Sequence, residues 1–125
     1  MSQRDTIDIQ VSTRYLEHQS DPENSRYVFG YTVTMRNDGV MAAQLLTRHW
    51  VITDANGKVQ EVRGTGVVGQ QPYLAPGADY EYSSGAILET SVGAMHGSYG
   101  MRNDSGELFD APITAFTLAV PGSLH

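Results

Sequence analysis

The sequence predicts an all-β protein, an antiparallel β-sandwich of the fibronectin type III (immunoglobulin-like) kind. Three observations favour this fold. Apolar and polar residues alternate over several short segments, turn residues recur at roughly the 8–12-residue spacing typical of a sandwich, and no stretch shows a convincing helical stripe. Thirteen glycines and five prolines separate the segments. Because no crossover helices intervene, two packed antiparallel sheets are expected, with an open barrel as the alternative.

The first part of the chain contains the clearest strand pattern. A strand is predicted where apolar and polar residues alternate from Ile7 to Val11. The polar stretch 18–25, which includes Pro22, is interpreted as a loop that supplies no core residue. Alternation is strongest over 27–37, where five large residues share one face: Tyr27, Phe29, Tyr31, Val33 and Met35. Turn residues follow this strand at 37–39.

The middle of the chain predicts a hairpin. A strand is expected over 45–53, with Trp50 on the same face as Leu46 and acting as the aromatic anchor of the core. Residues 54–57 have the composition of a hairpin turn that leads into a strand over 58–63.

The last third of the chain predicts three more strands. The first of them contains Tyr80 and Tyr82 and is expected to end at 83–85, where two serines precede a glycine. The remaining elements are expected, in order, as a strand over 93–101, a hairpin turn over 103–106 and a strand over 113–120.

Length and composition exclude several classes of function. The 125 residues predict one domain spanning residues 1–125. Fourteen acidic residues against eight basic ones give a net charge of −6, which argues against nucleic acid as a partner. No apolar run approaches the ~18 residues of a membrane span, and the amino end does not resemble a secretion signal, so a cytoplasmic protein without membrane contact is expected. The absence of cysteine excludes disulfides and a thiolate zinc site.

A glycine motif, G-x-G-x-x-G, is formed by Gly64, Gly66 and Gly69. A dinucleotide site would need a helix directly after the motif, and the two prolines within 70–77 exclude one. A weaker function remains: the loop amides, helped by Arg63, are candidates for binding phosphate or pyrophosphate. Because ordering the loop opposes binding, affinity no tighter than roughly millimolar is expected. The alternative is a plain connection between strands.

No catalytic or metal-binding constellation is recognisable. The histidines lack zinc-ligand spacing, and His49 is expected on the strand face opposite Trp50. The segments 54–57 and 103–106 resemble the start of calcium loops but lack the closing glutamate, so both are interpreted as turns. No catalytic residue, metal ligand or cofactor is therefore predicted, and the protein is expected not to be an enzyme.

Two blocks of sequence, 43–54 and 62–72, are similar to the bacterial ApaG family, also called CorD. The similarity continues through further blocks and covers almost the whole chain, at 74–77, 80–85, 93–101 and 109–118. It implies a fibronectin-type sandwich, a link to magnesium and cobalt homeostasis, and partner-binding roles for the same domain in larger eukaryotic proteins. No enzymatic activity is implied. One departure is Ser91, where the resemblance implies a proline.

The leading hypothesis is a non-enzymatic interaction module, associated only indirectly with divalent-cation homeostasis. Arg48, His49 and the loop over 64–69 are the candidate partner surface. The partner is expected to be a protein of unknown identity, and the chain a monomer or a weak edge-to-edge homodimer. The alternative is weak binding of pyrophosphate or a nucleotide polyphosphate through Arg63 and the glycine loop. An enzyme that acts on dinucleoside polyphosphates is the weakest reading, because no base can be named for it.

Overall fold

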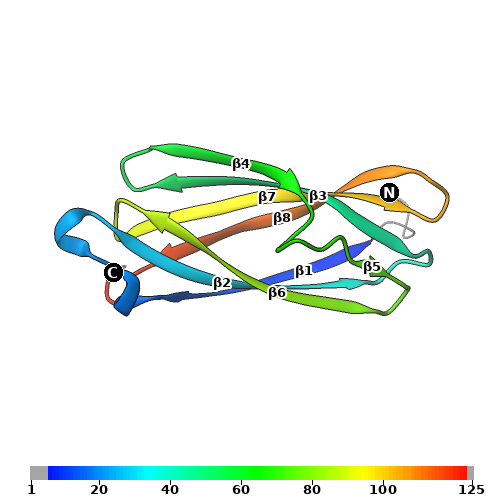
Figure 1. The fold of residues 1–125 in the computed structure, drawn as a ribbon, viewed down its shortest axis with the longest axis horizontal. Helices are drawn as coiled ribbons and strands as arrows, with labels where there is room; N and C mark the ends of the chain where they lie inside the picture. The colour runs from blue at the N-terminus through cyan, green and yellow to red at the C-terminus, as the bar shows by residue number, and fades with distance from the viewer. Residues whose placement is uncertain (1–5, 124–125) are drawn as a thin grey trace.

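The structure describes residues 6–123, and in this computed structural model they form two stacked antiparallel sheets (Figure 1). One sheet has the strand order β1-β2-β6, and the other has the order β4-β3-β7-β8, with β5 paired to β3. The strands are β1 (Ile7–Tyr15), β2 (Tyr27–Asn37), β3 (Ala43–Asp54), β4 (Val59–Thr65), β5 (Tyr73–Leu74), β6 (Asp79–Leu88), β7 (Val92–Asn103) and β8 (Leu108–Ala119). The predicted β-sandwich is confirmed, because the two sheets stay separate and do not close into a barrel.

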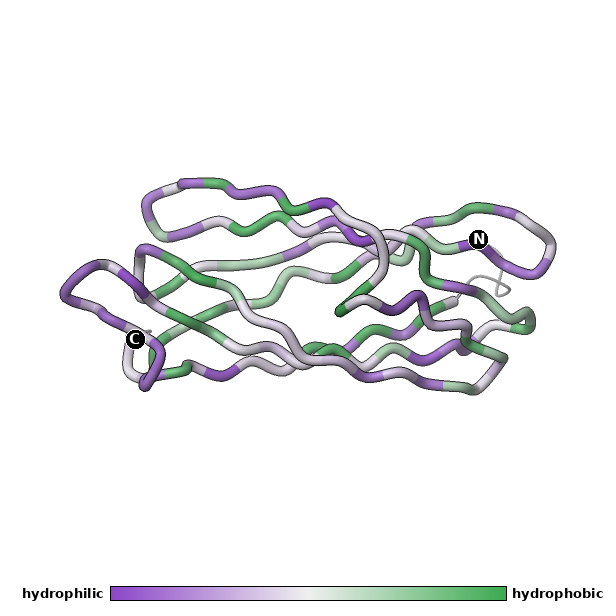
Figure 2. Tube along the Cα trace, in the orientation of Figure 1, coloured by the Kyte–Doolittle hydropathy of each residue, from purple (hydrophilic) through white to green (hydrophobic). Residues whose placement is uncertain are grey.

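The polar stretch after β1 contains two short 3₁₀ turns, Glu17–Gln19 (η2) and Pro22–Asn24 (η3). Neither turn buries a residue, and Figure 2 shows this segment as one of the most hydrophilic parts of the chain. The prediction of a loop without core residues is therefore confirmed. Across residues 6–123 no helix is long and apolar enough to cross a membrane.

The predicted end of the strand that contains Tyr80 is wrong. Residues 83–85 do not terminate it, and β6 continues to Leu88. The reason is that β2 supplies a partner along the whole strand, and Gly85 lies opposite Gly30 in the register. Pairing with a well-formed neighbour thus overrides the local turn preference of serine and glycine.

The predicted start of the last strand is also wrong. β8 begins at Leu108, five positions before the predicted 113, and it includes Pro112 opposite Ser98. Proline is tolerated in an outer strand, which has a ladder partner on one side only, and β8 is the outer strand of its sheet. The short strand β5 was not predicted, because two residues show no alternation.

A β-bulge interrupts β3 between Leu45 and Thr47. The bulge shifts the alternation by one residue, so Leu45 is fully buried and Leu46 is only half-buried. The prediction that Leu46 lies in phase with Trp50 is therefore wrong. A bulge changes which face a side chain occupies, and periodicity in the sequence does not reveal where one occurs.

Trp50 anchors the core, as predicted. It is 2% exposed, and its ring meets Tyr31, Phe116 and Tyr99 edge-on at centroid distances of 5.4, 5.9 and 6.2 Å. Such tilted aromatic pairs contribute roughly 0.5–1.5 kcal/mol each beyond the area that they bury. Both sheets supply rings to this cluster, so Trp50 joins the two layers near the middle of the sandwich.

Buried side chains close the turns after β2, β3 and β7. Asp54 Oδ1 accepts the backbone N–H groups two and four residues later, at 2.9 Å each. Asn103 Oδ1 accepts the equivalent groups at 3.0 and 3.1 Å, and the fully buried Asn37 donates to two carbonyls. Both segments considered as calcium loops are therefore turns, as predicted, with their side-chain oxygens engaged in backbone hydrogen bonds.

We expect Gly97→Ala to destabilise the fold by about 1–3 kcal/mol. Gly97 lies opposite Trp50 in the register, and a Cβ there would overlap the carbonyl oxygen of His49, a backbone atom that cannot move aside. The free energy of unfolding in urea measures the effect. Ser98→Ala, one residue away, is the control and should change that free energy by less than about 0.5 kcal/mol; equal effects of the two changes would contradict the close approach of β3 and β7.

Candidate functional site

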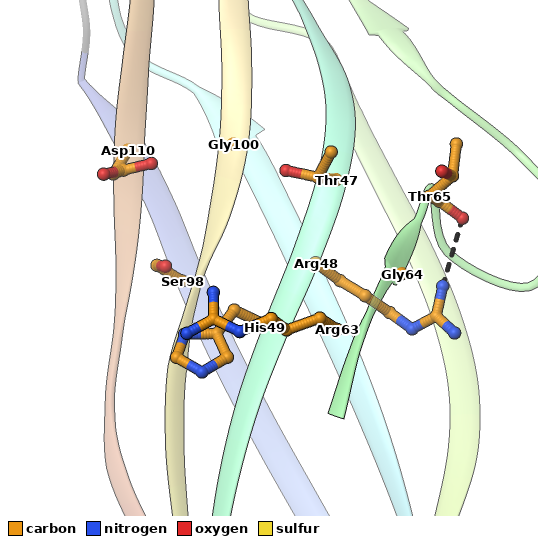
Figure 3. Close-up of a pocket in the computed structure, with 9 residues that line it drawn as sticks. All are labelled: Thr47, Arg48, His49, Arg63, Gly64, Thr65, Ser98, Gly100 and Asp110. Atoms are coloured by element: carbon orange, nitrogen blue, oxygen red, sulfur yellow. Dashed lines mark hydrogen bonds between the residues drawn. The ribbon is translucent and has the colours of Figure 1, made fainter. Parts of the chain in front are cut away.

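Arg48 covers Gly64 at the start of the glycine-rich loop. The two residues are register partners of β3 and β4, and a Cβ on residue 64 would lie 2.7 Å from the guanidinium of Arg48. Glycine is thus required there for the guanidinium to lie against the backbone. Arg48 Nη1 donates to the carbonyl oxygen of Thr65 at 3.1 Å (Figure 3) and to that of Gly66 at 2.9 Å. Arg48 therefore fixes the chain where it leaves β4.

Backbone hydrogen bonds fix the rest of the loop. The amide of Gly66 donates to the carbonyl of Leu46, the bulge residue, at 2.8 Å, and the Gln71 side chain donates to the same oxygen at 3.0 Å. Val67 and Gln70 exchange two backbone hydrogen bonds of 2.8 and 2.9 Å and so close a two-residue turn. The loop is therefore an ordered structure with its own hydrogen bonds.

The two residues inside this turn both have positive φ, +48° for Val68 and +77° for Gly69. Glycine adopts this conformation without penalty, which explains the third glycine of the motif. A β-branched residue there is a genuine outlier, so Val68 is strained. Its side chain is nevertheless 64% exposed and contributes little to the core.

Val67 points the other way, into the sandwich. It is fully buried and lines a cavity of about 230 Å³ together with residues of both sheets: Tyr31, Arg48, Trp50, Val68, Tyr82, Ser83 and Ser84. The loop thus inserts one apolar side chain between the sheets, and Figure 1 shows the chain after β4 turning back toward β6. No helix follows the motif within the described residues, since the chain continues directly to β5. This confirms the prediction that the prolines within 70–77 exclude the helix of a dinucleotide site.

The outer face of the larger sheet has a hollow of about 540 Å³ beside the loop. Its lining comes from four neighbouring strands (Figure 3): Thr47, Arg48, His49, Arg63, Gly64, Thr65, Ser98, Gly100 and Asp110. The hollow exists because small residues form its floor, where Gly100 lies opposite Thr47 and Asp110. It brings together four of the six predicted site residues, and Gly66 and Gly69 lie outside it.

The charged groups of the hollow are partly paired. His49 Nε2 lies 3.1 Å from Glu61 Oε1, and Arg63, whose side chain is 70% exposed, lies 3.9 Å from the same oxygen. Glu61 was not recognised from the sequence, because only the register of the β3–β4 hairpin brings it beside His49. Thr47, Ser98 and Asp110 were missed because only the register of β3, β7 and β8 brings them together, although the small residues of 93–101 were visible in the sequence.

Burial raises the pKa of the tyrosines under the loop. Desolvation is the main cause for Tyr31, Tyr82 and Tyr99, and the Tyr82 and Tyr99 hydroxyls are hydrogen-bonded to each other. The Ser84 hydroxyl and the Arg48 charge act in the opposite sense on the pKa of Tyr31. These phenols are therefore neutral at physiological pH. Within residues 6–123 no group of three or more His, Asp or Glu side chains is arranged to hold a metal ion.

Comparisons with known proteins identify close relatives. A family model described as the ApaG domain matches residues 17–103. The Protein ApaG of Ectopseudomonas mendocina is 60% identical over 119 residues, covering 95% of this chain and 94% of its own length. That of Azoarcus sp. is 56% identical over 127 residues and covers all of both chains. A crystal structure of a protein described as ApaA from Bordetella pertussis is 49% identical with a TM-score of 0.91, over 94% of this chain and 96% of that one.

We expect Gly64→Ala to destabilise the protein by about 1 kcal/mol, because the new Cβ displaces the Arg48 guanidinium from the loop carbonyls and breaks its two partly exposed hydrogen bonds. Val68→Asn, in the same loop, is the matched control. Asparagine tolerates positive φ better than valine, so this variant should be at least as stable as the parent. Urea unfolding measures both, and an unchanged stability of Gly64→Ala would show that Arg48 does not fix the loop.

A second prediction concerns alkaline pH. The folded-state pKa values of Tyr31, Tyr82 and Tyr99 lie above the ordinary phenol pKa of about 10. The unfolded chain therefore releases these protons first as pH rises. Stability is fully present below pH ~10 and should fall above it. Urea unfolding across this range measures the fall, and the double variant Tyr82→Phe, Tyr99→Phe should show a shallower one. An equally steep fall in the double variant would contradict this account.

Proposed function

Because this chain belongs to the ApaG family, we propose that it is a non-enzymatic binding module that presents the outer face of its larger sheet and the adjoining glycine loop to a protein partner. The partner surface consists of Arg48, His49 and the loop over 64–69. One observation carries the proposal: the loop locks Val67 in the core while it holds the adjacent Val68 exposed in a strained conformation. Strained residues persist where the surroundings fix them, and they cluster at ligand contacts.

The non-enzymatic part of the proposal is supported by the side chains of the hollow. His49 and Glu61 form a pair with the spacing of a base and its orienting acid. Ser98 lies opposite His49 in the register, but among the described residues no hydrogen bond joins these two side chains. Among the described residues His49 is thus not hydrogen-bonded to a nucleophile, which supports a role of the hollow as contact surface.

The link to magnesium and cobalt homeostasis is proposed to be indirect, through the partner, and to operate in the cytoplasm. No cluster of three metal-ligating side chains occurs in residues 6–123, and a net charge of −6 attracts cations only diffusely. Calorimetry with magnesium or cobalt should therefore detect no tight stoichiometric site on the isolated chain. A tight site would overturn the indirect role.

Weak pyrophosphate or nucleotide-polyphosphate binding is the second candidate. The observation that favours it is the exposed Arg63 beside the hydroxyls of Thr47, Thr65 and Ser98 in one hollow. Two features oppose it: Asp110 lines the same hollow, and the amide of Gly66 is already used by the bulge. Because these two features oppose binding, we expect pyrophosphate to bind with a dissociation constant no lower than roughly millimolar.

The partner is tested by affinity capture from the native host. The unaltered chain should recover a protein that the double variant His49→Asp, Arg63→Glu recovers at least about tenfold less, because His49→Asp adds a negative charge and Arg63→Glu reverses a positive charge at the hollow. Arg36→Ala, on the other sheet and 54% exposed, is the control and should capture the same protein as the parent. Identical recovery by all three chains would contradict the proposed surface.

The second candidate is tested by titrating ¹⁵N-labelled protein with pyrophosphate and with ATP. Shifts confined to Arg63, Gly64, Gly66 and Gly69, with saturation only at high millimolar ligand, would support a weak anion site. Saturation at micromolar ligand would make nucleotide recognition the leading function. No shift would leave the loop as a contact surface and strand connection.

A further inference from the structure

One side of the sandwich is open between the outer strands β4 and β6. The strand orders put β1 and β8 at one side, where they pack together, and β4 and β6 at the other. Two hollows follow one another along this opening: the cavity under the loop, and a second of about 480 Å³ lined by Gln19, Arg26, Val28, Ile52, Gln60, Val62, Gly85, Ala86 and Ile87. We call the two hollows together the seam.

The seam runs along the free edge of β6. Ala86 and Ile87 are neighbours on one strand, so their side chains point to opposite faces of the sheet, yet both line the second hollow. A hollow that touches both faces lies at the edge of the strand. Within the described residues β6 has a strand neighbour on its β2 side only, so its other edge presents backbone N–H and C=O groups that an added strand can pair with.

The seam also exposes apolar side chains. Val62 of β4 is 38% exposed and Ile87 of β6 is 45% exposed, with the buried side chains of Ile52 and Val28 beneath them. An extended segment that added to β6 would cover both exposed side chains. Backbone pairing combined with alternate apolar side chains is how strand addition binds peptides.

The charge of the seam is opposite to that of the molecule. Arg26 lines one hollow and Arg48 the other, and no lining residue of either hollow is acidic, although the chain as a whole carries a net charge of −6. Neither guanidinium forms an ion pair with a carboxylate of residues 6–123. The seam is therefore complementary to a segment that carries acidic residues at both ends.

Both ends of the seam are closed. Val67 fills the space between the sheets at the Arg48 end. At the other end Lys58 Nζ bonds Glu89 Oε1 at 2.9 Å, which joins the β3–β4 turn to the segment after β6. The opening between them follows the six residues of β6 from Ser83 to Leu88, which an extended peptide of about seven residues at ~3.3 Å each can span with its ends at the two arginines.

We propose that the seam binds an extended segment of a partner protein, which adds a strand to β6, packs apolar side chains on Val62 and Ile87, and carries acidic residues at the Arg26 and Arg48 ends. This inference rests on the proposed function, because it supplies the chemistry of the partner. Arg48 takes part in this interaction where it lines the cavity under the loop, whereas His49 lines only the outer hollow.

A synthetic seven-residue peptide tests the proposal directly. It has glutamate at positions one and seven, valine at three, four and five, and threonine elsewhere, so that valines on the two faces of the added strand can reach Val62 and Ile87 respectively. Added to ¹⁵N-labelled protein up to about 1 mM, it should shift the amides of β6 from Ser83 to Leu88 and slow their exchange with solvent. The same peptide with lysine at both ends, or with a central proline that blocks strand pairing, should bind at least about tenfold more weakly.

Variants locate the contact on the protein. Val62→Lys and Arg26→Glu should each weaken binding at least about tenfold. Val59→Lys and Arg102→Glu are the matched controls: Val59 is an exposed valine and Arg102 an exposed arginine, and neither lines the seam. The controls should change binding by less than about twofold. The unfolding transition of each variant verifies that the variant is folded. The amide shifts that the peptide causes in the unaltered protein test the proposal without any variant.

The remaining outcomes separate this inference from the proposed function. Shifts at His49 and Ser98 without shifts in β6 would overturn the seam and support the outer hollow. No shift with any peptide would overturn the seam, while the lysate capture would still test the partner surface independently. Protection of β6 that grows with protein concentration in the absence of peptide would show that a second copy of the chain occupies the edge, which would also overturn the proposal.

Discussion

The contact between the guanidinium of Arg48 and the bare backbone of Gly64 is the one on which the glycine loop and the hollow beside it depend. The guanidinium donates to the carbonyls of Thr65 and Gly66, and hydrogen bonds from a charged donor contribute roughly 1.5–3 kcal/mol each. These bonds, together with the burial of Val67, offset the strain of about 1–3 kcal/mol stored at Val68. The loop therefore keeps a conformation that its own residues disfavour, with Val67 inside and Val68 outside.

The bulge at Leu46 makes this arrangement possible. A regular strand would use the Leu46 carbonyl in the ladder, whereas the bulge leaves it available to accept the amide of Gly66 and the side chain of Gln71. The same one-residue shift turns Arg48 toward the loop and His49 toward the outer hollow. The bulge thus determines which carbonyl holds the loop and where Arg48 points. It also determines which side chains line the cavity under the loop and the outer hollow.

The sequence predicted the fold class because alternation and turn residues are local signals. The strand over 27–37, the core position of Trp50 and the side-chain-closed turns at 54–57 and 103–106 all follow from such signals. Strand ends were less accurate, because β2 extends β6 past its serines and glycine by pairing with it. The site was only partly predictable. Arg48 and Gly64 are sixteen positions apart, and Glu61, Ser98 and Asp110 reach the hollow only through the register of four strands.

The insertion of Val67 affects the fluorescence of Trp50. The chain contains a single tryptophan, and Trp50 lines the same cavity as Val67 and Arg48. Withdrawal of the loop would admit water to the indole and to the ring of Tyr31, which packs against it at 5.4 Å. The emission of the native protein is therefore a label-free gauge of whether the loop is seated, and no introduced fluorophore is needed to follow that equilibrium in time.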